Sequence, residues 1–97
     1  MKQLIIAIDY DDTFTADPGL FSAFVALAKR NHTVCIVTAR RCTDENIEKL
    51  NADLDHWDCQ MPIFFTSLQS KTEYMKKIGI DVNIWIDDNP HALLNGH

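Results

Sequence analysis

Four stretches of the chain are almost entirely apolar, and more polar segments with helical periodicity separate them. The apolar stretches lie near residues 3–8, 33–38, 62–66 and 82–87. Continuous apolar runs of this length are typical of strands that are buried on both faces of a parallel sheet. We therefore predict a βαβαβαβ chain whose right-handed crossovers place four strands in one parallel sheet.

Each predicted helix begins at a residue that can cap it. Asp17 precedes the first helix, Thr43 the second and Ser70 the third, and such side chains accept hydrogen bonds from first-turn backbone N–H groups. Gly79 ends the third helix, and we expect the segment 53–60 after the second to be irregular. The predicted core-facing positions are Leu20, Phe21, Phe24, Val25, Leu27 and Ala28 in the first helix, Ile47, Leu50 and Leu54 in the second, and Tyr74, Met75 and Ile78 in the third.

The composition limits the class of protein. The 97 residues suit a single domain spanning 1–97, and the formal net charge of -5 argues against nonspecific binding of nucleic acid. Three cysteines without a CxxC spacing favour reduced thiols in a cytoplasmic protein over disulfides or a thiolate zinc site. The chain opens directly with the first strand, and no apolar run approaches transmembrane length. We therefore expect neither a signal peptide nor membrane contact.

Polar residues follow three of the predicted strands. Residues 9–13, Asp-Tyr-Asp-Asp-Thr, come directly after the first, Thr38 and Arg40 follow the second, and Asp87 and Asp88 follow the fourth. Carboxylates about 4 Å apart repel by roughly 4 kcal/mol near a protein surface, so the acidic cluster needs a cation, a proton or full solvation. Residues 9–13 could form a solvated acidic turn, but three acids within four residues favour a functional site more. Taken alone, Thr38 is an ordinary strand-end residue and Asp87-Asp88 an ordinary turn. Ligands of open α/β sheets bind beyond the carboxyl ends of the strands, so we expect the three segments to form one site.

The order of these features resembles the haloacid dehalogenase (HAD) superfamily, whose phosphohydrolases use an aspartate nucleophile. Its motifs are Asp-x-Asp-x-Thr, a Thr or Ser after a strand, a Lys, and an acidic pair. Residues 9–13, Thr38, Lys71 and the pair Asp87-Asp88 match them over essentially the whole chain. The resemblance implies a three-layer αβα sandwich, an HAD-like Rossmannoid fold with a minimal four-stranded parallel sheet. The first strand must then lie between the second and the fourth, which gives the strand order 4-1-2-3.

The resemblance also implies catalytic and phosphate-binding residues. Asp9 corresponds to the nucleophile that takes the phosphoryl group. Asp11 corresponds to the acid that protonates the leaving oxygen and then acts as the base that activates water. Thr38 and Lys71 correspond to phosphate-binding residues. Arg40 is a further candidate for the substrate phosphate, although it could equally balance the acids at the start of the second helix.

Mg2+ is the cofactor that the resemblance implies. Its ligands would be Asp9, the backbone carbonyl of Asp11, and the pair Asp87 and Asp88, and which member of the pair contacts the ion stays open. A hard divalent cation with oxygen ligands offsets the clustered negative charge and allows a carboxylate to approach an anionic phosphate.

Some positions depart from the family pattern or leave alternatives. Asp12 stands where these enzymes usually have Gly; because Asp tolerates left-handed backbone, we expect the turn to form and the approach of the substrate to differ. Lys76 and Lys77 compete with Lys71, which we prefer because the start of the helix faces the site. The four histidines are expected on the surface, although His91 follows the acidic pair closely enough to contact a substrate.

The first functional hypothesis is a magnesium-dependent phosphatase with an aspartyl-phosphate intermediate on Asp9. No segment is long enough for a cap domain, so we expect either a large phosphorylated substrate, such as a nucleic-acid end or a phosphoprotein, or a homo-oligomer. The alternative is a catalytically weak protein that binds or sequesters a phosphorylated or nucleotide-like ligand. A receiver-type signalling domain fits less well, because its acceptor Asp would follow the third strand, where this chain has Phe65 and Thr66.

Overall fold

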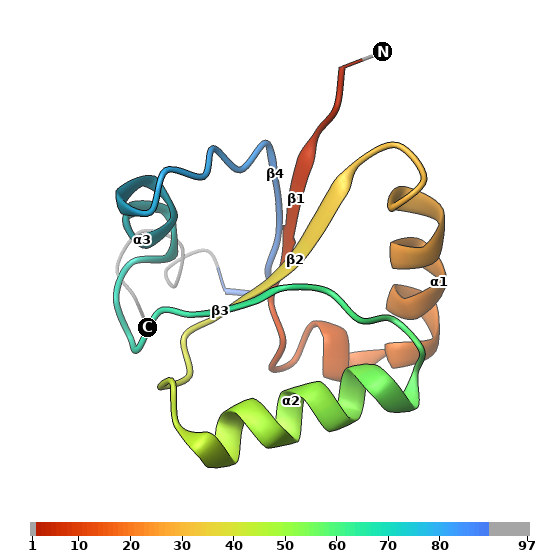
Figure 1. Ribbon diagram of the computed structural model, residues 1–97, viewed down its shortest axis with the longest axis horizontal. Helices are drawn as coiled ribbons and strands as arrows, with labels where there is room; N and C mark the ends of the chain where they lie inside the picture. Colours follow the sequence, from red (N-terminus) through yellow and green to blue (C-terminus); the bar gives the residue numbers. More distant parts are fainter. Residues whose placement is uncertain (1, 90–97) are drawn as a thin grey trace.

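A computed structural model describes residues 2–89, which form a parallel four-stranded sheet with three α-helices (Figure 1). The strands are β1 (Ile5–Ile8), β2 (Thr33–Thr38), β3 (Ile63–Phe65) and β4 (Ile84–Ile86), and the helices are α1 (Pro18–Ala28), α2 (Asp44–His56) and α3 (Lys71–Lys77). A short 3-10 helix, η1 (Phe14–Ala16), leads from β1 toward α1. None of the helices in the described part of the chain has the length and apolar content needed to cross a membrane.

The strands lie in the order β3-β2-β1-β4, and all three neighbouring pairs are parallel. Read from the opposite edge, this order is 4-1-2-3, and β1 lies between β2 and β4. Ile6 of β1 is in register with Val34 of β2 and with Ile84 of β4. The segments that follow β1, β2 and β4 therefore leave the sheet at the same edge.

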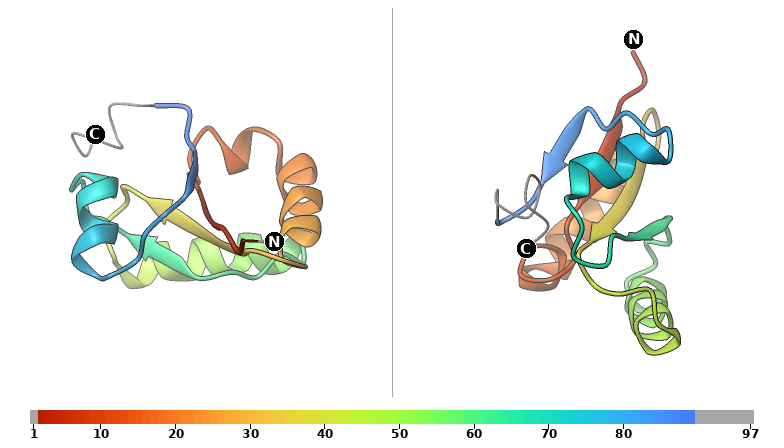
Figure 2. Two further views of the ribbon diagram at one scale, coloured as in Figure 1. Left: turned by 90° about the horizontal axis from the view of Figure 1, so that it is seen from above. Right: turned by 90° about the vertical axis from the view of Figure 1, so that its left-hand side faces the viewer.

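Helices cover both faces of the sheet, and Figures 1 and 2 show α1 and α3 on opposite sides of β1. On one face, Ile8 and Ile36 belong to a core cluster with Leu54 of α2 and with residues of α1. On the other face, Ala7 packs in a smaller cluster with Met75 of α3. Successive residues of a strand point to opposite faces, so a continuous apolar run supplies both cores.

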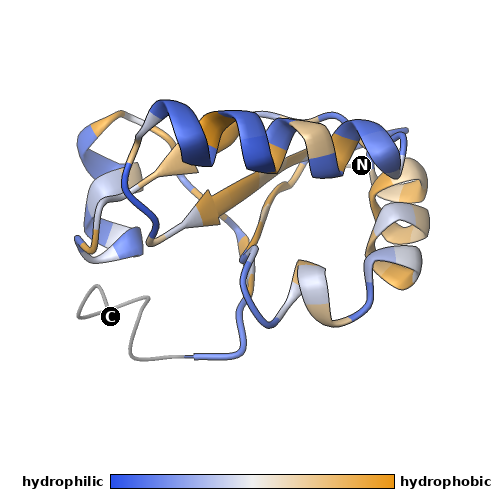
Figure 3. Ribbon diagram, turned by 90° about the horizontal axis from the view of Figure 1, so that it is seen from below, coloured by the Kyte–Doolittle hydropathy of each residue, from blue (hydrophilic) through white to orange (hydrophobic). Residues whose placement is uncertain are grey.

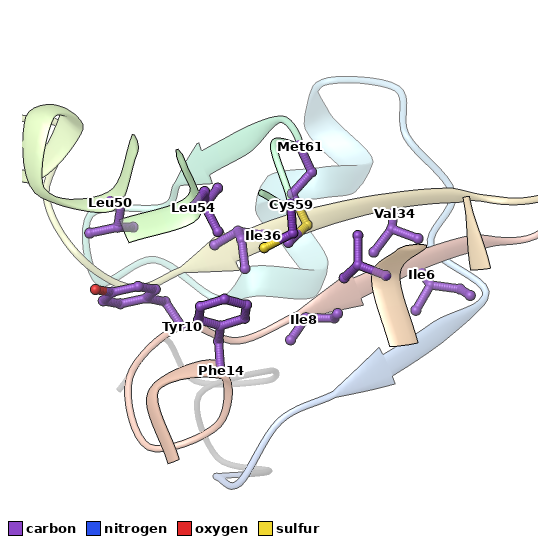
Figure 4. Packing of buried hydrophobic residues seen from close by; sticks show 11 residues of the cluster. Ile6, Ile8, Tyr10, Phe14, Val34, Ile36, Leu50, Leu54, Cys59 and Met61 are labelled. Carbon is purple, nitrogen blue, oxygen red and sulfur yellow. The ribbon is translucent and has the colours of Figure 1, made fainter. Parts of the chain in front are cut away.

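The larger core extends to the carboxyl end of β1. Tyr10 and Phe14 stack there with ring centroids 6.2 Å apart, and Leu50 and Leu54 of α2 lie on the same side of the sheet (Figure 4). Tyr10 is only 2% exposed although it stands between two acidic residues. The packing of its ring therefore fixes the backbone that carries the acids on either side.

The three predicted helix starts are confirmed. The side chains of Asp17, Thr43 and Ser70 each accept a hydrogen bond from the backbone N–H three residues later, at 3.1, 3.2 and 3.4 Å. The end of α3 follows the predicted pattern as well, because Gly79 has a φ of 83°, in the left-handed region that favours glycine after a helix.

Two expectations about the helices were wrong. The segment 53–60 is not irregular throughout, because α2 continues to His56 and the Trp57 N–H still donates to the Asp53 carbonyl at 3.2 Å. Four residues expected in the core are exposed, namely Leu20 (59%), Leu27 (64%), Ile47 (37%) and Ile78 (45%). A helix at the surface buries only one stripe of its side chains, and the apolar positions of α1 extend beyond that stripe. Figure 3 shows that α1 is more hydrophobic than the outer side of α2.

β2 spans the predicted residues 33–38, whereas β1, β3 and β4 are shorter than predicted. At the start of β1, the Leu4 N–H donates to His32 Nδ1 at 3.0 Å and the Ile5 N–H donates to Asn83 Oδ1 at 2.8 Å. Side chains thus take the place of strand neighbours there. His32, expected on the surface, is half-buried for this reason. The prediction for His91 lies outside the described residues.

Candidate active site

A pocket of about 180 Å³ opens where the segments after β1, β2 and β4 meet the start of α3. Its lining consists mostly of carboxylates. The lining residues are Asp9, Asp11, Asp12, Ala39, Lys71, Asp87, Asp88 and Asn89. Residues that are up to 80 positions apart in the sequence therefore share one small pocket because the strands that carry them are neighbours and parallel.

Lys71 is the buried cation of this pocket. Its Nζ donates to Asp9 Oδ1 at 2.8 Å and to Asp87 Oδ2 at 2.6 Å, and the side chains of Lys71 and Asp87 are each 2% exposed. An ammonium group removed from water needs such partners, because its desolvation costs several kcal/mol. The two rival lysines, Lys76 and Lys77, are exposed near the opposite end of α3. Of these three lysines, only Lys71 lines the pocket.

Burial governs the ionisation of Asp9. Its removal from water raises its pKa to about 6, although the hydrogen bond and the charge of Lys71 act in the opposite direction. The neighbouring charge of Asp87 raises the pKa further. Asp9 is thus largely ionised near neutral pH, and any additional cation in the pocket would favour its charged form.

Thr13 connects the loop after β1 with the residues after β4, a role that the sequence did not reveal. Its hydroxyl is 3.4 Å from Asp9 Oδ2 and 3.3 Å from Asp88 Oδ1, and it accepts a hydrogen bond from the Asp88 backbone N–H at 3.2 Å. Thr13 is the last residue of the Asp-x-Asp-x-Thr stretch, so the motif itself was the available signal.

Three carboxylates form a group that could hold a metal ion. Asp9, Asp87 and Asp88 each offer one oxygen, and these oxygens all lie within 4.8 Å of one another. An all-oxygen, anionic donor set suits a hard divalent cation such as magnesium rather than a soft metal. The Asp11 carboxylate does not belong to this group.

Arg40 binds Asp11. Its Nε and Nη2 donate to the two carboxylate oxygens of Asp11 at 2.9 and 2.8 Å, and its Nη1 donates to Asn46 Oδ1 at 2.9 Å. The guanidinium carbon lies 5.3 Å from the ring centroid of Tyr10. The sequence left open whether Arg40 meets a substrate anion or the acids of α2, and the structure pairs it with Asp11. These hydrogen bonds hold the pKa of Asp11 below its usual range.

Helix α2 makes two polar contacts near this ion pair, one with Arg40 and one with Tyr10, whose ring lies beside the guanidinium. Asn46 lies in its first turn, where Thr43 caps the helix, and binds Arg40. Asp53, further along the helix, accepts a hydrogen bond from the Tyr10 hydroxyl at 2.8 Å. Burial and this hydrogen bond raise the pKa of Tyr10 to about 12. Nothing in the sequence spacing indicated these contacts.

Thr38 lies deeper than its expected role requires. It is fully buried at the end of β2, and its hydroxyl accepts a hydrogen bond from the Arg40 backbone N–H at 3.2 Å. The next residue, Ala39, lines the pocket in its place. The described structure therefore uses the Thr38 hydroxyl to shape the loop after β2.

Asp12 adopts the left-handed backbone that was expected for the turn after β1. Its φ is 61°, and its backbone N–H donates to the Thr15 hydroxyl at 3.0 Å. Its side chain is exposed at the pocket. The turn thus forms with Asp at this position, and an additional carboxylate lies at the pocket.

Comparison of the chain with protein-family models, with curated proteins and with solved structures finds no match. A functional assignment therefore has to rest on the arrangement of these side chains.

Proposed function

We propose that this chain is a magnesium-dependent phosphohydrolase with an HAD-like fold and with Asp9 as its nucleophile. The observation that carries the proposal is the buried ammonium of Lys71, held between Asp9 and Asp87 at the carboxyl edge of a parallel sheet. Ionisable residues with strongly perturbed pKa values occur preferentially at functional sites, and Asp9 beside Lys71 is such a residue. A cation fixed beside a nucleophilic carboxylate offsets the repulsion between that carboxylate and an incoming phosphate.

In the first step, a carboxylate oxygen of Asp9 attacks the phosphorus of a phosphomonoester, and the bond from phosphorus to the leaving oxygen breaks. The leaving oxygen takes a proton from Asp11 in its acid form. Asp9, the Asp11 carbonyl and the acidic pair Asp87-Asp88 would hold magnesium, which would supply positive charge that offsets the repulsion of the reacting anions. Lys71 contributes the same kind of charge from the protein side.

In the second step, a water molecule attacks the phosphorus of the aspartyl-phosphate and loses its proton to the Asp11 carboxylate. The acyl phosphate bond breaks, inorganic phosphate leaves, and the carboxylate of Asp9 is restored. The contact with Arg40 favours the ionised form of Asp11 and so suits this role as a base. To act as the acid in the first step, Asp11 must exchange the contact with Arg40 for a proton.

The other proposed roles receive unequal support. Lys71 lines the pocket and suits phosphate contact, whereas Thr38 and Arg40 would have to change their present partners first. Both oxygens of Asp87 already accept hydrogen bonds, from Lys71 and from the Asn89 backbone, which favours Asp88 as the direct metal ligand. The proposed substrate is large, or several copies of the chain assemble, because a pocket without a cap domain needs another surface to exclude water from the transferring group. The proposed location is the cytoplasm.

A second candidate function is binding or sequestration of a phosphorylated ligand with little turnover. The specific observation in its favour is the bidentate contact in which Arg40 occupies both carboxylate oxygens of Asp11. If that contact persists when ligand is bound, the leaving group finds no proton donor, and the pocket holds its ligand without cleaving it.

Substitution of the two acids separates these functions. With an aryl phosphate, whose leaving group needs no protonation, the Asp11→Asn variant should form the aspartyl-phosphate but hydrolyse it slowly. Intact-protein mass spectrometry should then show an added phosphoryl group. The Asp9→Asn/Asp11→Asn variant should show none, because the nucleophile is gone. Asp58→Asn, which removes an exposed carboxylate that does not line the pocket, serves as the control and should behave as wild type.

The decisive negative result is equally clear. Wild-type protein that binds phosphate esters but releases no phosphate in millimolar magnesium, with no labelled Asp11→Asn protein, would reject the phosphohydrolase and favour the binding protein.

A further inference from the structure

The pocket carries more negative charge than the proposed reaction uses. Its lining includes the carboxylates of Asp9, Asp11, Asp12, Asp87 and Asp88, with Lys71 as the lining cation. Lys71 is buried between two of these acids, and Arg40 is bound to a third. When Asp11 carries the proton that the first step needs, the four remaining carboxylates are balanced by these two cations and one divalent metal ion, so no positive charge is left over to offset the exposed carboxylate of Asp12. Lys71, buried between Asp9 and Asp87, does not offer its charge to the part of a substrate beyond the phosphate.

Asp12 supplies the carboxylate that has no part in the proposed chemistry. Its backbone conformation, with a φ of 61°, and the hydrogen bond from its N–H to Thr15 hold the turn in place. Its side chain is exposed and lines the pocket. A substrate whose phosphate enters the pocket must place its neighbouring groups near this carboxylate. Charges within about 10 Å interact appreciably at 0.1 M salt, so the sign of those groups affects binding.

The neighbouring segments do not reverse this charge. Arg41 and Lys49 are exposed near the start of α2, but the stretch 44–51 also contains three acidic residues. Residues 90–97, which follow the pocket residues in sequence, contain neither Lys nor Arg. Among residues 2–89, the basic side chains of this region are accompanied by acids and do not form a cluster that would bind a second phosphate group.

We propose that the site selects phosphomonoesters whose neighbouring groups are positively charged, and that Asp12 is a specificity-determining residue for this selection. The inference rests on the proposed phosphohydrolase function and narrows its substrate class. Nucleoside di- and triphosphates and nucleic-acid ends, which bring further phosphates close to the reacting one, are disfavoured. A phosphoserine flanked by lysines has the preferred chemistry, and so does a small phosphate ester of a quaternary ammonium alcohol.

A matched pair of peptides tests the proposal. Each peptide contains one phosphoserine, flanked by lysines in one and by glutamates in the other, and phosphate release is measured at 0.1 M salt with saturating magnesium. We expect kcat/KM to be roughly tenfold or more higher for the lysine peptide, and the preference should shrink in 1 M salt. Phosphocholine and glycerol 3-phosphate form a second pair, which shows whether the preference extends to small esters.

Two isosteric variants assign the effect to one residue. Asp12→Asn should reduce the preference for the lysine peptide by about three- to tenfold, mainly by improving the glutamate peptide, because one charge at the pocket is removed. Asp58→Asn is the matched control, since Asp58 is exposed and also has a positive φ, of 51°, but does not line the pocket. It should leave the preference unchanged. No preference in wild type, or equal effects of the two variants, would overturn the proposal.

Binding separates this proposal from the proposed function. Phosphonate versions of both peptides, with CH2 in place of the bridging oxygen, bind without turnover, and their affinities are measured by fluorescence anisotropy. Selective binding of the lysine phosphonate without phosphate release from any peptide would support the selection and reject catalysis. Equal binding of both phosphonates, with magnesium-dependent release from both phosphopeptides, would do the reverse.

Discussion

Substitution of Lys71 by methionine is the most direct test of the candidate site. The variant keeps a side chain of similar length but removes the ammonium group that lies 2.8 Å from Asp9 and 2.6 Å from Asp87. Two carboxylates then remain close together without the cation that now contacts both. Because the Lys71 side chain is 2% exposed, water cannot easily replace the lost contacts.

The expected loss of stability is large. At an effective dielectric constant of about 20, an ion pair near 2.7 Å is worth roughly 6 kcal/mol before desolvation is subtracted. Removal of one partner from a buried pair costs about 3–5 kcal/mol in practice, which is a substantial part of the stability of a domain this small. We therefore expect the free energy of unfolding at pH 7 to fall by about 3–5 kcal/mol in Lys71→Met. Magnesium should restore part of it, because the metal ion replaces the missing positive charge.

Urea unfolding with and without magnesium measures this effect. Lys77→Met is the matched control on the same helix, because Lys77 is exposed in the last turn, and its loss should cost less than about 1 kcal/mol. If Lys71→Met is unfolded at pH 7, the comparison moves to pH 5, where protonation of Asp9 relieves the repulsion. A loss no greater than that of Lys77→Met would contradict the buried ion-pair arrangement. A loss that magnesium does not reduce would contradict the proposed metal site.

Two further predictions concern ionisation. The pKa of Asp9 is about 6 in the folded state, against its ordinary value of 3.8, so between these pH values the folded state binds more protons than the unfolded state. Without magnesium, the free energy of unfolding should therefore fall by up to about 3 kcal/mol as the pH rises from 4 to 6. Saturating magnesium should flatten this slope, and urea titrations from pH 4 to pH 7 that run parallel in both conditions would refute the assignment. Arg40→Gln and Asp11→Asn should be non-additive by about 0.5–1 kcal/mol, a modest coupling because both side chains are partly exposed. Strict additivity of the double variant in the same assay would show that their contact does not contribute in solution.

The sequence by itself determined where the helices begin and at which edge of the sheet the candidate site lies. A helix cap depends on residues three positions apart, so Asp17, Thr43 and Ser70 could be identified without knowledge of the fold. Continuous apolar runs indicated a parallel sheet, and the resemblance of the polar residues after three of them to the HAD motifs implied that β1 lies between β2 and β4.

Only the tertiary structure decided which side chains contact one another within the pocket. Arg40 and Asp11 are 29 positions apart, and Lys71 and Asp9 are 62 apart, so no local periodicity relates them. Whether an arginine at a strand end meets a substrate, a helix or a neighbouring acid depends on the direction in which its side chain leaves the loop. The exposure of Leu27 has a similar origin, because the sheet and the neighbouring helices set how much of an apolar helix can be covered. Such contacts depend on how separate elements pack, and a linear pattern of residues does not contain that distance information.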